Sequence, residues 1–359
     1  MWLRGLSRDW IRVPLPEADT VHDVSYGNGL FLILGTTHLE RQPDTQYACV
    51  WTSSTGSQWE SHLVSDVMLK NREQLQLSLA VTVESERRGI FLLFADRLYT
   101  SRTGEDWISV RQTPWVSSAA PNTLACVMDG YCVALSPGGI QTVISQTSDY
   151  GQTWTSRMVG SQFVDTGDND QGIFIGVGES GNILRGLVRD DSFNIEWNRV
   201  TPQFGEEISS LIFAGGRFVA SSESYAIFSS FDGAKWNRTE SPSLSFVAHG
   251  ESAFLATFSN GRQVNIYSSV DAEHWILFSQ IDGKHEVVQF LFDGHSFLMM
   301  GRKCDDCDQF ESEEGDEEYV PFLYSSSHGT SWELEDLSGI SDSFPIMVVW
   351  NSEIGRAHV

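Results

Sequence analysis

The chain alternates short apolar runs with tight polar breaks, and this pattern predicts β-hairpins. The clearest examples are VSYGNGLFLILG (24–35), CVMDGYCVAL (126–135), LIFAGGRFVA (211–220) and FLFDGHSFLMMG (290–301). Asn-Gly or Asp-Gly between such runs favours a hairpin because these residues adopt positive φ at little steric cost. A third run then enters a recurrent tryptophan phrase, as in YAIFSS, and a fourth leaves it, as in WNRTES. Each repeat therefore predicts four short strands.

The tryptophan phrase recurs with a period close to the length of a propeller blade. SSFDGAKW occupies residues 229–236, and related phrases end at Trp59, Trp107, Trp154, Trp197, Trp275 and Trp332. Successive tryptophans, with Trp236 included, are 48, 47, 43, 39, 39 and 57 residues apart. Such a period is typical of propellers and solenoids. We therefore predict an all-β fold, a single β-propeller of four-stranded blades with seven complete modules plus a split partial one, which gives seven or eight blades.

The phrase predicts the turn from the third strand to the fourth. Asp232 can accept hydrogen bonds from nearby backbone N–H groups, and Gly233 can adopt the left-handed conformation. Trp236 would bury a large ring between neighbouring blades. We interpret the phrase as a structural element of the fold rather than a binding site.

These phrases resemble the Asp-box, or bacterial neuraminidase repeat, of the sialidase-like β-propellers. TSDYGQTW (147–154) matches the pattern Ser/Thr-x-Asp-x-Gly-x-Thr-Trp throughout, whereas Thr55, Thr103 and His328 replace the aspartate in three copies. The resemblance implies structural roles for Asp149, Gly151, Trp154, Asp232, Gly233, Trp236, Asp271, Trp275, Trp59, Trp107 and Trp332. The family includes sialidases, other glycoside hydrolases, sortilin-type receptors and a photosystem II assembly factor. The resemblance therefore implies the fold and leaves the function open.

Composition and charge narrow the classes of partner. The 359 residues, 41% of them hydrophobic, provide enough core for one closed propeller, and the net charge is −25. This charge disfavours binding to a phosphate backbone and suits a cationic partner. No apolar stretch is long enough to span a membrane, and the start MWLRGLSRDW lacks the apolar core of a secretory signal. We expect a soluble monomer in an unknown compartment, with no nucleic-acid partner and no membrane insertion.

The two ends of the chain suggest a divided blade. Trp10 resembles the fourth strand of a repeat with nothing before it, and SFPIMVVW (343–350) resembles a first strand with nothing behind it. The last seven residues, EIGRAHV, resemble the translation of a sequencing adapter. We therefore assign residues 1–352 to a C-terminally truncated propeller and 353–359 to an adapter-derived tail, with a genuine polar tail as the alternative.

Candidate catalytic chemistry is confined to one arginine. A sialidase needs three arginines, a tyrosine activated by glutamate, and an acid/base aspartate. IRVP (11–14) offers Arg12, but its position after Trp10 indicates an outer strand, where an exposed structural arginine is the alternative. No other member of the catalytic set can be identified, so we do not expect an enzyme; a glycoside hydrolase would be the exception.

A propeller commonly binds ligands on the face opposite the Asp-box turns. The connections predicted there are TTHLERQPDTQY (36–47), SPGGIQT (136–142), SNGRQ (259–263) and the segment 302–319. They contain our ligand-face candidates, which are His38, Arg41, Arg262, Asp305 and Asp306. An exposed polar loop explains His38 and Arg41 equally well.

The segment 302–319 is the longest connection and the most acidic. Cys304 and Cys307 form a CxxC, which is half of a zinc site, and the surrounding acids could bind calcium. A redox-labile disulfide and a solvated acidic loop are the alternatives, so we predict no cofactor and keep zinc or calcium at this loop as a hypothesis. We interpret Cys126 and Cys132 as small buried apolar residues rather than a disulfide.

Three functions remain after these observations. The first is a non-catalytic binding or scaffold module that recognises a protein or a glycan through the face opposite the Asp-box turns. The second is a sialidase-like glycoside hydrolase. The third is an assembly factor similar to the photosystem II propeller, with its acidic loop on a basic partner. Because fold does not determine function, the absence of catalytic motifs favours the first.

Overall fold

In a computed structural model, the described part of the chain folds into strands and turns, β1 to β30. The chain divides into two compact units, an N-terminal unit (Met1–Thr201) and a C-terminal unit (Pro202–Val359). The residues that the structure describes are 2–4, 10–12, 16, 18–27, 29–39, 42–69, 78–81, 91–94, 98–110, 123–127, 130–137, 141–149, 151–160, 163–169, 172–178, 181–189, 194–200, 205–239, 243–292, 294–304 and 320–335.

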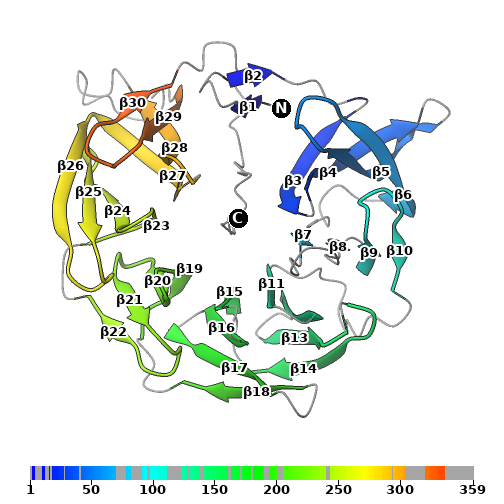
Figure 1. The fold of residues 1–359 in the computed structure, drawn as a ribbon, viewed down its shortest axis with the longest axis horizontal. Coiled ribbons are helices and arrows are strands. Elements are labelled where there is room, and N and C mark those ends of the chain that lie inside the picture. The colour runs from blue at the N-terminus through cyan, green and yellow to red at the C-terminus, as the bar shows by residue number, and fades with distance from the viewer. Residues whose placement is uncertain are drawn as a thin grey trace, which may run out of the picture. The chain divides into compact units, whose positions relative to one another are not determined.

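Among its described residues, the N-terminal unit forms four four-stranded antiparallel sheets and one two-stranded sheet (Figure 1). In each four-stranded sheet, strands that follow one another in the chain are neighbours. The strands are β1 (Trp2–Arg4), β2 (Trp10–Arg12), β3 (Thr20–Gly27), β4 (Leu30–Leu39), β5 (Gln42–Ser53), β6 (Glu60–Leu69), β7 (Ser78–Val81), β8 (Phe91–Phe94), β9 (Leu98–Ser101), β10 (Ile108–Ser109), β11 (Thr123–Val127), β12 (Tyr131–Pro137), β13 (Thr142–Thr147), β14 (Thr155–Val159), β15 (Phe163–Asp168), β16 (Ile173–Gly178), β17 (Ile183–Arg189) and β18 (Asn194–Arg199).

The C-terminal unit forms three more four-stranded antiparallel sheets with the same sequential order among its described residues. Its strands are β19 (Ile208–Ala214), β20 (Arg217–Ser222), β21 (Ile227–Ser230), β22 (Asn237–Arg238), β23 (Val247–His249), β24 (Phe254–Ser259), β25 (Gln263–Ser269), β26 (Ile276–Asp282), β27 (Lys284–Phe292), β28 (Phe297–Cys304), β29 (Val320–Ser326) and β30 (Glu333–Leu334). The described residues thus form seven four-stranded sheets, which confirms the seven predicted modules.

The four predicted hairpins are present as β3–β4, β11–β12, β19–β20 and β27–β28. One predicted connection is wrong, however. Residues 36–47 were expected to form a loop, but β4 continues to Leu39 and β5 begins at Gln42. The pairing of Thr37 with Tyr47 and of His38 with Gln46 extends this hairpin, because Pro43, which has no N–H to donate, falls where the register shifts and, among the described residues, takes no partner in the ladder.

The first strand of four sheets carries a β-bulge near its start, in β3, β15, β19 and β27. In three of these sheets a glycine pairs with the residue before the bulge, Gly35 in β4, Gly178 in β16 and Gly301 in β28. A Cβ at position 35 or 301 would collide with a carbonyl oxygen of the bulged strand, that of Thr20 or Glu286. Gly35 and Gly301 are therefore required by close backbone approach.

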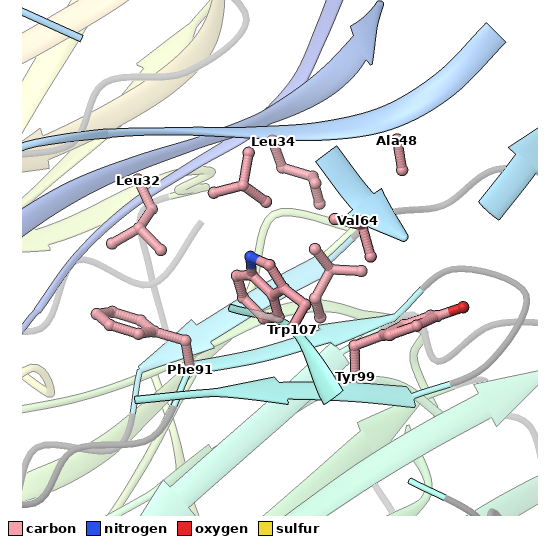
Figure 2. Close-up of a cluster of buried hydrophobic side chains, with 9 residues drawn as sticks. Leu32, Leu34, Ala48, Val64, Phe91, Tyr99 and Trp107 are labelled. Atoms are coloured by element: carbon pink, nitrogen blue, oxygen red, sulfur yellow. The ribbon is translucent and has the colours of Figure 1, made fainter. Parts of the chain in front are cut away.

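The cores lie between neighbouring sheets, and the phrase tryptophans contribute to them. In the N-terminal unit, Trp107 is only 7% exposed and packs with Leu32 and Leu34 of β4 and with Phe91 and Tyr99 of β8 and β9. Figure 2 shows the Trp107 ring at the centre of this cluster. Because apolar faces of consecutive sheets meet here, the phrase that ends at Trp107 stabilises a sheet-to-sheet interface as well as its own turn.

Two expectations about cysteine require correction. Cys126 and Cys132 are directly opposite each other on β11 and β12, and they form a disulfide instead of remaining reduced apolar residues. Their separation along the chain was visible in the sequence, but the register that places them face to face was not. Cys304 is also disulfide-bonded, so its sulfur is not a thiolate that could bind zinc. Cys307, Asp305 and Asp306 lie outside the described residues.

The N-terminal segment also differs from expectation. The stretch containing Trp10 forms a strand, β2, but it pairs with the preceding strand β1 in a two-stranded sheet. The backbone of Arg12 is opposite Trp2 in this sheet. Residues 343–350 and 353–359, on which the divided blade and the adapter-derived tail depend, lie outside the described residues.

Candidate functional site

Each four-stranded sheet has two ends of different character. The third strand meets the fourth at the turn end, which contains the tryptophan phrase. The second strand meets the third at the opposite end, here called the connection end. In an antiparallel meander these two turns necessarily lie at opposite ends of the third strand.

The turn ends share one hydrogen-bond pattern. In five turns a glycine N–H donates to the side-chain oxygen of the phrase's Ser or Thr, and the tryptophan Nε1–H donates to the same glycine's carbonyl oxygen. In the SSFDGAKW turn these distances are 2.8 Å from Gly233 N to Ser230 Oγ and 2.9 Å from Trp236 Nε1 to Gly233 O. The other four pairs are Gly56–Trp59, Gly104–Trp107, Gly151–Trp154 and Gly329–Trp332.

The phrase carboxylates are also occupied within their own turns. Asp271 accepts from the N–H groups of Glu273 and His274, at 2.9 Å and 2.8 Å. Burial opposes ionisation, but these hydrogen bonds outweigh it and hold the pKa of Asp271 well below its usual range. In two copies that lack aspartate, Thr55 and Thr103 accept a backbone N–H in the same way. The carboxylates thus organise turns and are not directed toward a ligand.

The turn of the sixth phrase, which ends at Trp275, departs from the pattern. Ala272 occupies the glycine position and still has a positive φ of 53°. Trp275 Nε1 is buried and, within the described part of the chain, has no hydrogen-bond partner. This turn is anchored instead through Glu273, which accepts from Arg217 at 3.0 Å and from Asn237 at 3.1 Å, both on the neighbouring sheet. The hydrogen bond from Asn237 is the main reason that the pKa of Glu273 is lowered.

The predicted ligand-face candidates that the structure describes, His38 and Arg262, belong to different units. His38 lies in β4 of the N-terminal unit, where its Nδ1 pairs with Asp19. Arg262 lies in the β24–β25 turn of the C-terminal unit, where its N–H donates to Asn260 Oδ1 at 3.0 Å. Arg41 lies outside the described residues, as do Asp305 and Asp306.

The connection end of the C-terminal unit contains a strained aromatic residue that the sequence analysis missed. Tyr225, between β20 and β21, has a φ of 64°, and among the described non-glycine residues only Ala272 shares a positive φ. Its N–H donates to Ser222 O at 3.0 Å, and its carbonyl accepts from Leu244 N at 2.7 Å. The side chain is 49% exposed. Left-handed non-glycine residues cost about 1–3 kcal/mol and cluster at functional sites, so Tyr225 marks a candidate site.

Tyr225 contacts a neighbouring sheet that carries three side-chain amides next to Phe258. Its ring packs edge-on against Phe258 of β24, with 5.7 Å between ring centroids, and Phe258 is directly opposite Asn265 of β25. Asn265 Oδ1 accepts from Gln263 Nε2 at 2.8 Å and from Gln280 Nε2 at 2.7 Å. We call Tyr225, Phe258, Gln263, Asn265 and Gln280 the Tyr225 site.

Gln263, Asn265 and Gln280, here called the amide trio, keep hydrogen-bonding groups that their mutual bonds do not use. Within the described part of the chain, neither Asn265 Nδ2 nor the Oε1 atoms of Gln263 and Gln280 take part in a hydrogen bond. Asn265 is 8% exposed, and its Nδ2 is not among the buried atoms that lack a partner. The trio therefore presents the NH2 group of Asn265 and two glutamine carbonyl oxygens, with orientations fixed by the bonds to Asn265 Oδ1.

Glutamates support and flank this site. Glu206 Oε2 accepts from Ser222 Oγ at 3.0 Å and Ser224 Oγ at 2.6 Å, and its Oε1 accepts from Arg238 Nη2 at 2.8 Å. Burial opposes ionisation, yet these hydrogen bonds lower the pKa of Glu206. Glu206 thus holds the loop that carries Tyr225 and is a positioning residue.

The chemistry of the Tyr225 site is that of recognition. Ring faces and amides bind by stacking and hydrogen bonding, and the half-buried carboxylate of Glu206 is already hydrogen-bonded to Arg238 and two serines. Among the described residues, no group of three or more His, Cys, Asp or Glu side chains could hold a metal ion. The only sequence signal for the site was an aromatic residue in a short polar connection, SESYA (222–226), where glycine or asparagine would be usual.

Comparison with known proteins identifies the fold class. Neither a family model nor a curated protein sequence matches the chain. Among solved structures, the computationally designed Ika8 protein is similar with a TM-score of 0.55, 10% identity, and coverage of 90% of this chain and 97% of that one. A structure of YCF48 bound to D1 peptide is similar with a TM-score of 0.50, 15% identity, and coverage of 75% and 86%. YCF48 from Cyanidioschyzon merolae shows a TM-score of 0.43, 14% identity, and coverage of 69% and 95%.

These similarities, with the seven four-stranded antiparallel sheets, define the class. The protein is an all-β protein with a β-propeller fold. At such identities the likeness shows the fold alone. Within the residues described, the search for a helix long and apolar enough to cross a membrane found none.

Proposed function

We propose that this protein is a non-catalytic β-propeller binding module that recognises an extended polypeptide segment at the Tyr225 site. The observation that carries the proposal is Tyr225 itself. Two hydrogen bonds hold the backbone of Tyr225 in a costly left-handed conformation, and its half-exposed ring contacts Phe258, which lies opposite Asn265 of the preorganised amide trio. Preorganised exposed aromatic groups commonly anchor binding partners because little conformational entropy is lost on association.

The hydrogen-bonding pattern favours a polypeptide over other ligands. A peptide unit offers one N–H donor and one carbonyl acceptor, which complement a glutamine Oε1 and Asn265 Nδ2. A structure of YCF48, a protein similar in fold, contains a bound D1 peptide, so this architecture is compatible with peptide recognition. A scaffold or assembly role would use the same type of contact.

Selection from a displayed library of random linear peptides would test the proposal. The full chain is immobilised, and enriched peptides are then measured against the wild type, Tyr225→Gly and Gln280→Ala. Glycine keeps the backbone conformation of residue 225, and Gln280 is exposed, so both variants should fold. We expect each substitution to weaken binding about tenfold, the effect of a typical interface anchor.

Three results would overturn the proposal. The first is failure to enrich any peptide, and the second is enrichment of peptides that bind Tyr225→Gly as well as the wild type. The third is binding of an arrayed glycan, with no peptide, in a manner that depends on Tyr225. Thermal unfolding of both variants alongside the wild type shows whether weaker binding reflects loss of the fold.

A further inference from the structure

We infer, on the basis of the proposed function, that the polypeptide segment recognised at the Tyr225 site carries a cationic side chain, which lies on the Tyr225 ring between Glu207 and Glu223. Both glutamates border the same connection end. The N–H of Glu223 donates to the carbonyl of Glu207 at 3.0 Å, so the two residues are adjacent, and Glu223 is two residues from Tyr225.

The three glutamates near Tyr225 have different roles. The carboxylate of Glu206 already accepts hydrogen bonds from Arg238, Ser222 and Ser224. Glu207 and Glu223 are exposed, and within the described residues neither side chain has an ion pair or hydrogen bond. Because their backbones are joined by a hydrogen bond, the two negative charges lie on neighbouring chain segments and add to the local negative potential. A bound cation would be attracted by both.

The aromatic ring adds a preference for the same charge. The Tyr225 and Phe258 rings meet at an interplanar angle of 77°, an edge-to-face contact that leaves much of the Tyr225 ring in solvent. A guanidinium or ammonium group over an aromatic face contributes about 0.5–1 kcal/mol at exposed sites. Overall charge acts in the same direction, because 48 acidic side chains outnumber 23 basic ones and attract cationic segments over long distances.

Defined peptides test this inference with a matched charge control. A labelled, capped peptide of alternating arginine and glycine is titrated with the full chain by fluorescence anisotropy, next to its counterpart with citrulline in place of arginine. The variant is Glu207→Gln/Glu223→Gln. The control is Glu251→Gln/Glu333→Gln, which changes the net charge equally at two other exposed positions of the same unit that have no recorded partner among the described residues.

We expect the arginine peptide to bind more tightly than the citrulline peptide. The Glu207→Gln/Glu223→Gln variant loses two partly exposed charge pairs with the peptide, so the Kd of the arginine peptide should rise about three- to tenfold. The control should change this Kd less than about twofold. Tyr225→Phe should retain the preference for arginine and Tyr225→Leu should reduce it, because only the former keeps the aromatic ring.

The outcomes separate this inference from the function on which it rests. If the library yields peptides that require Tyr225 but are neutral or acidic, the cationic side chain is excluded and peptide binding stands. Equal losses in the variant and in its charge control would also overturn the inference, because they indicate non-specific attraction. If no peptide binds through Tyr225, both proposals fail.

Discussion

The turn end and the connection end of the C-terminal unit use polar groups in opposite ways. At the turn end, the SSFDGAKW turn satisfies Ser230, Asp232 and Trp236 internally, and the glycine carries the positive φ. At the connection end, Tyr225 carries the positive φ, and Glu207 and Glu223 have no recorded ion pair or hydrogen bond among the described residues. The repeated SSFDGAKW turn thus uses its polar groups to stabilise the fold. The Tyr225 connection does not follow the repeat, and the carboxylates of Glu207 and Glu223 are available to a ligand.

The largest expected effect on stability comes from removing a phrase tryptophan at the turn end. Trp107→Ala should lower the free energy of unfolding by about 3–5 kcal/mol, because it empties the centre of a buried cluster. Ile108→Ala, one residue later and 70% exposed, is the control and should cost less than about 0.5 kcal/mol. Urea unfolding followed by fluorescence or circular dichroism measures both. Similar values for the two variants would show that the tryptophan phrase is not structural.

Two glycines with the same backbone conformation allow the packing at the two ends to be compared directly. Gly329, in a turn end, and Gly261, in a connection end, both have a φ of 79°. A Cβ at position 329 would overlap Leu255 Cδ1, whereas nothing lies within 4 Å of one at position 261.

We therefore expect Gly329→Ala to cost about 2–4 kcal/mol, from backbone strain plus overpacking. Gly261→Ala should cost about 1 kcal/mol, from strain alone. Thermal and urea unfolding of both variants provide the test, and equal costs would remove the distinction between packed and open turns.

The ionisation of Asp271 gives the turn end a pH dependence. Because hydrogen bonds lower the pKa of Asp271 in the folded state, the stability it contributes is present above its unfolded pKa and is lost as the pH falls toward the folded value. Asp271→Ala removes two backbone hydrogen bonds and should cost about 1 kcal/mol at neutral pH.

The difference between wild type and Asp271→Ala should narrow as the pH falls below about 4. The hydrogen bond with Asp271 raises the pKa of His274, so the contribution of this pair is present at mildly acidic pH and declines as the pH rises through the folded-state pKa of His274. Urea unfolding at several pH values follows both trends. A difference that is constant with pH would exclude the ionised pair.

The smallest expected effect on stability is at the candidate site. Tyr225→Gly relieves about 1 kcal/mol of left-handed strain and loses an edge-to-face contact worth about 0.5–1.5 kcal/mol. We therefore expect a net change within about 1 kcal/mol, although peptide binding weakens. If unfolding experiments show a large loss of stability, Tyr225 has a structural role like that of the phrase tryptophans, and the contrast between the two ends disappears.

Local signals allowed much of the fold to be predicted from the sequence. The tryptophan phrases, the Gly-containing hairpins and the period gave the seven modules because turn chemistry depends on a few adjacent residues. The prediction failed where pairing extends beyond a turn. The β4–β5 hairpin continues through polar residues, and Cys126 faces Cys132 because of strand register.

The candidate site could not be predicted in the same way. Of the predicted ligand-face residues, Arg262 lies in a recognisable turn of the C-terminal unit. His38 belongs to the other unit and pairs with Asp19. The successive members Tyr225, Phe258, Asn265 and Gln280 are separated along the chain by 7 to 33 residues and come from two sheets. No short motif links them.

By itself, the sequence determined the repeated turns of this protein, because a glycine, a hydroxyl and a tryptophan within eight residues satisfy one another locally. Only the tertiary structure placed Tyr225 beside Phe258 and the amide trio. That placement depends on how two sheets pack and on which residues of paired strands lie opposite each other, and both are decided by long-range burial and strand register.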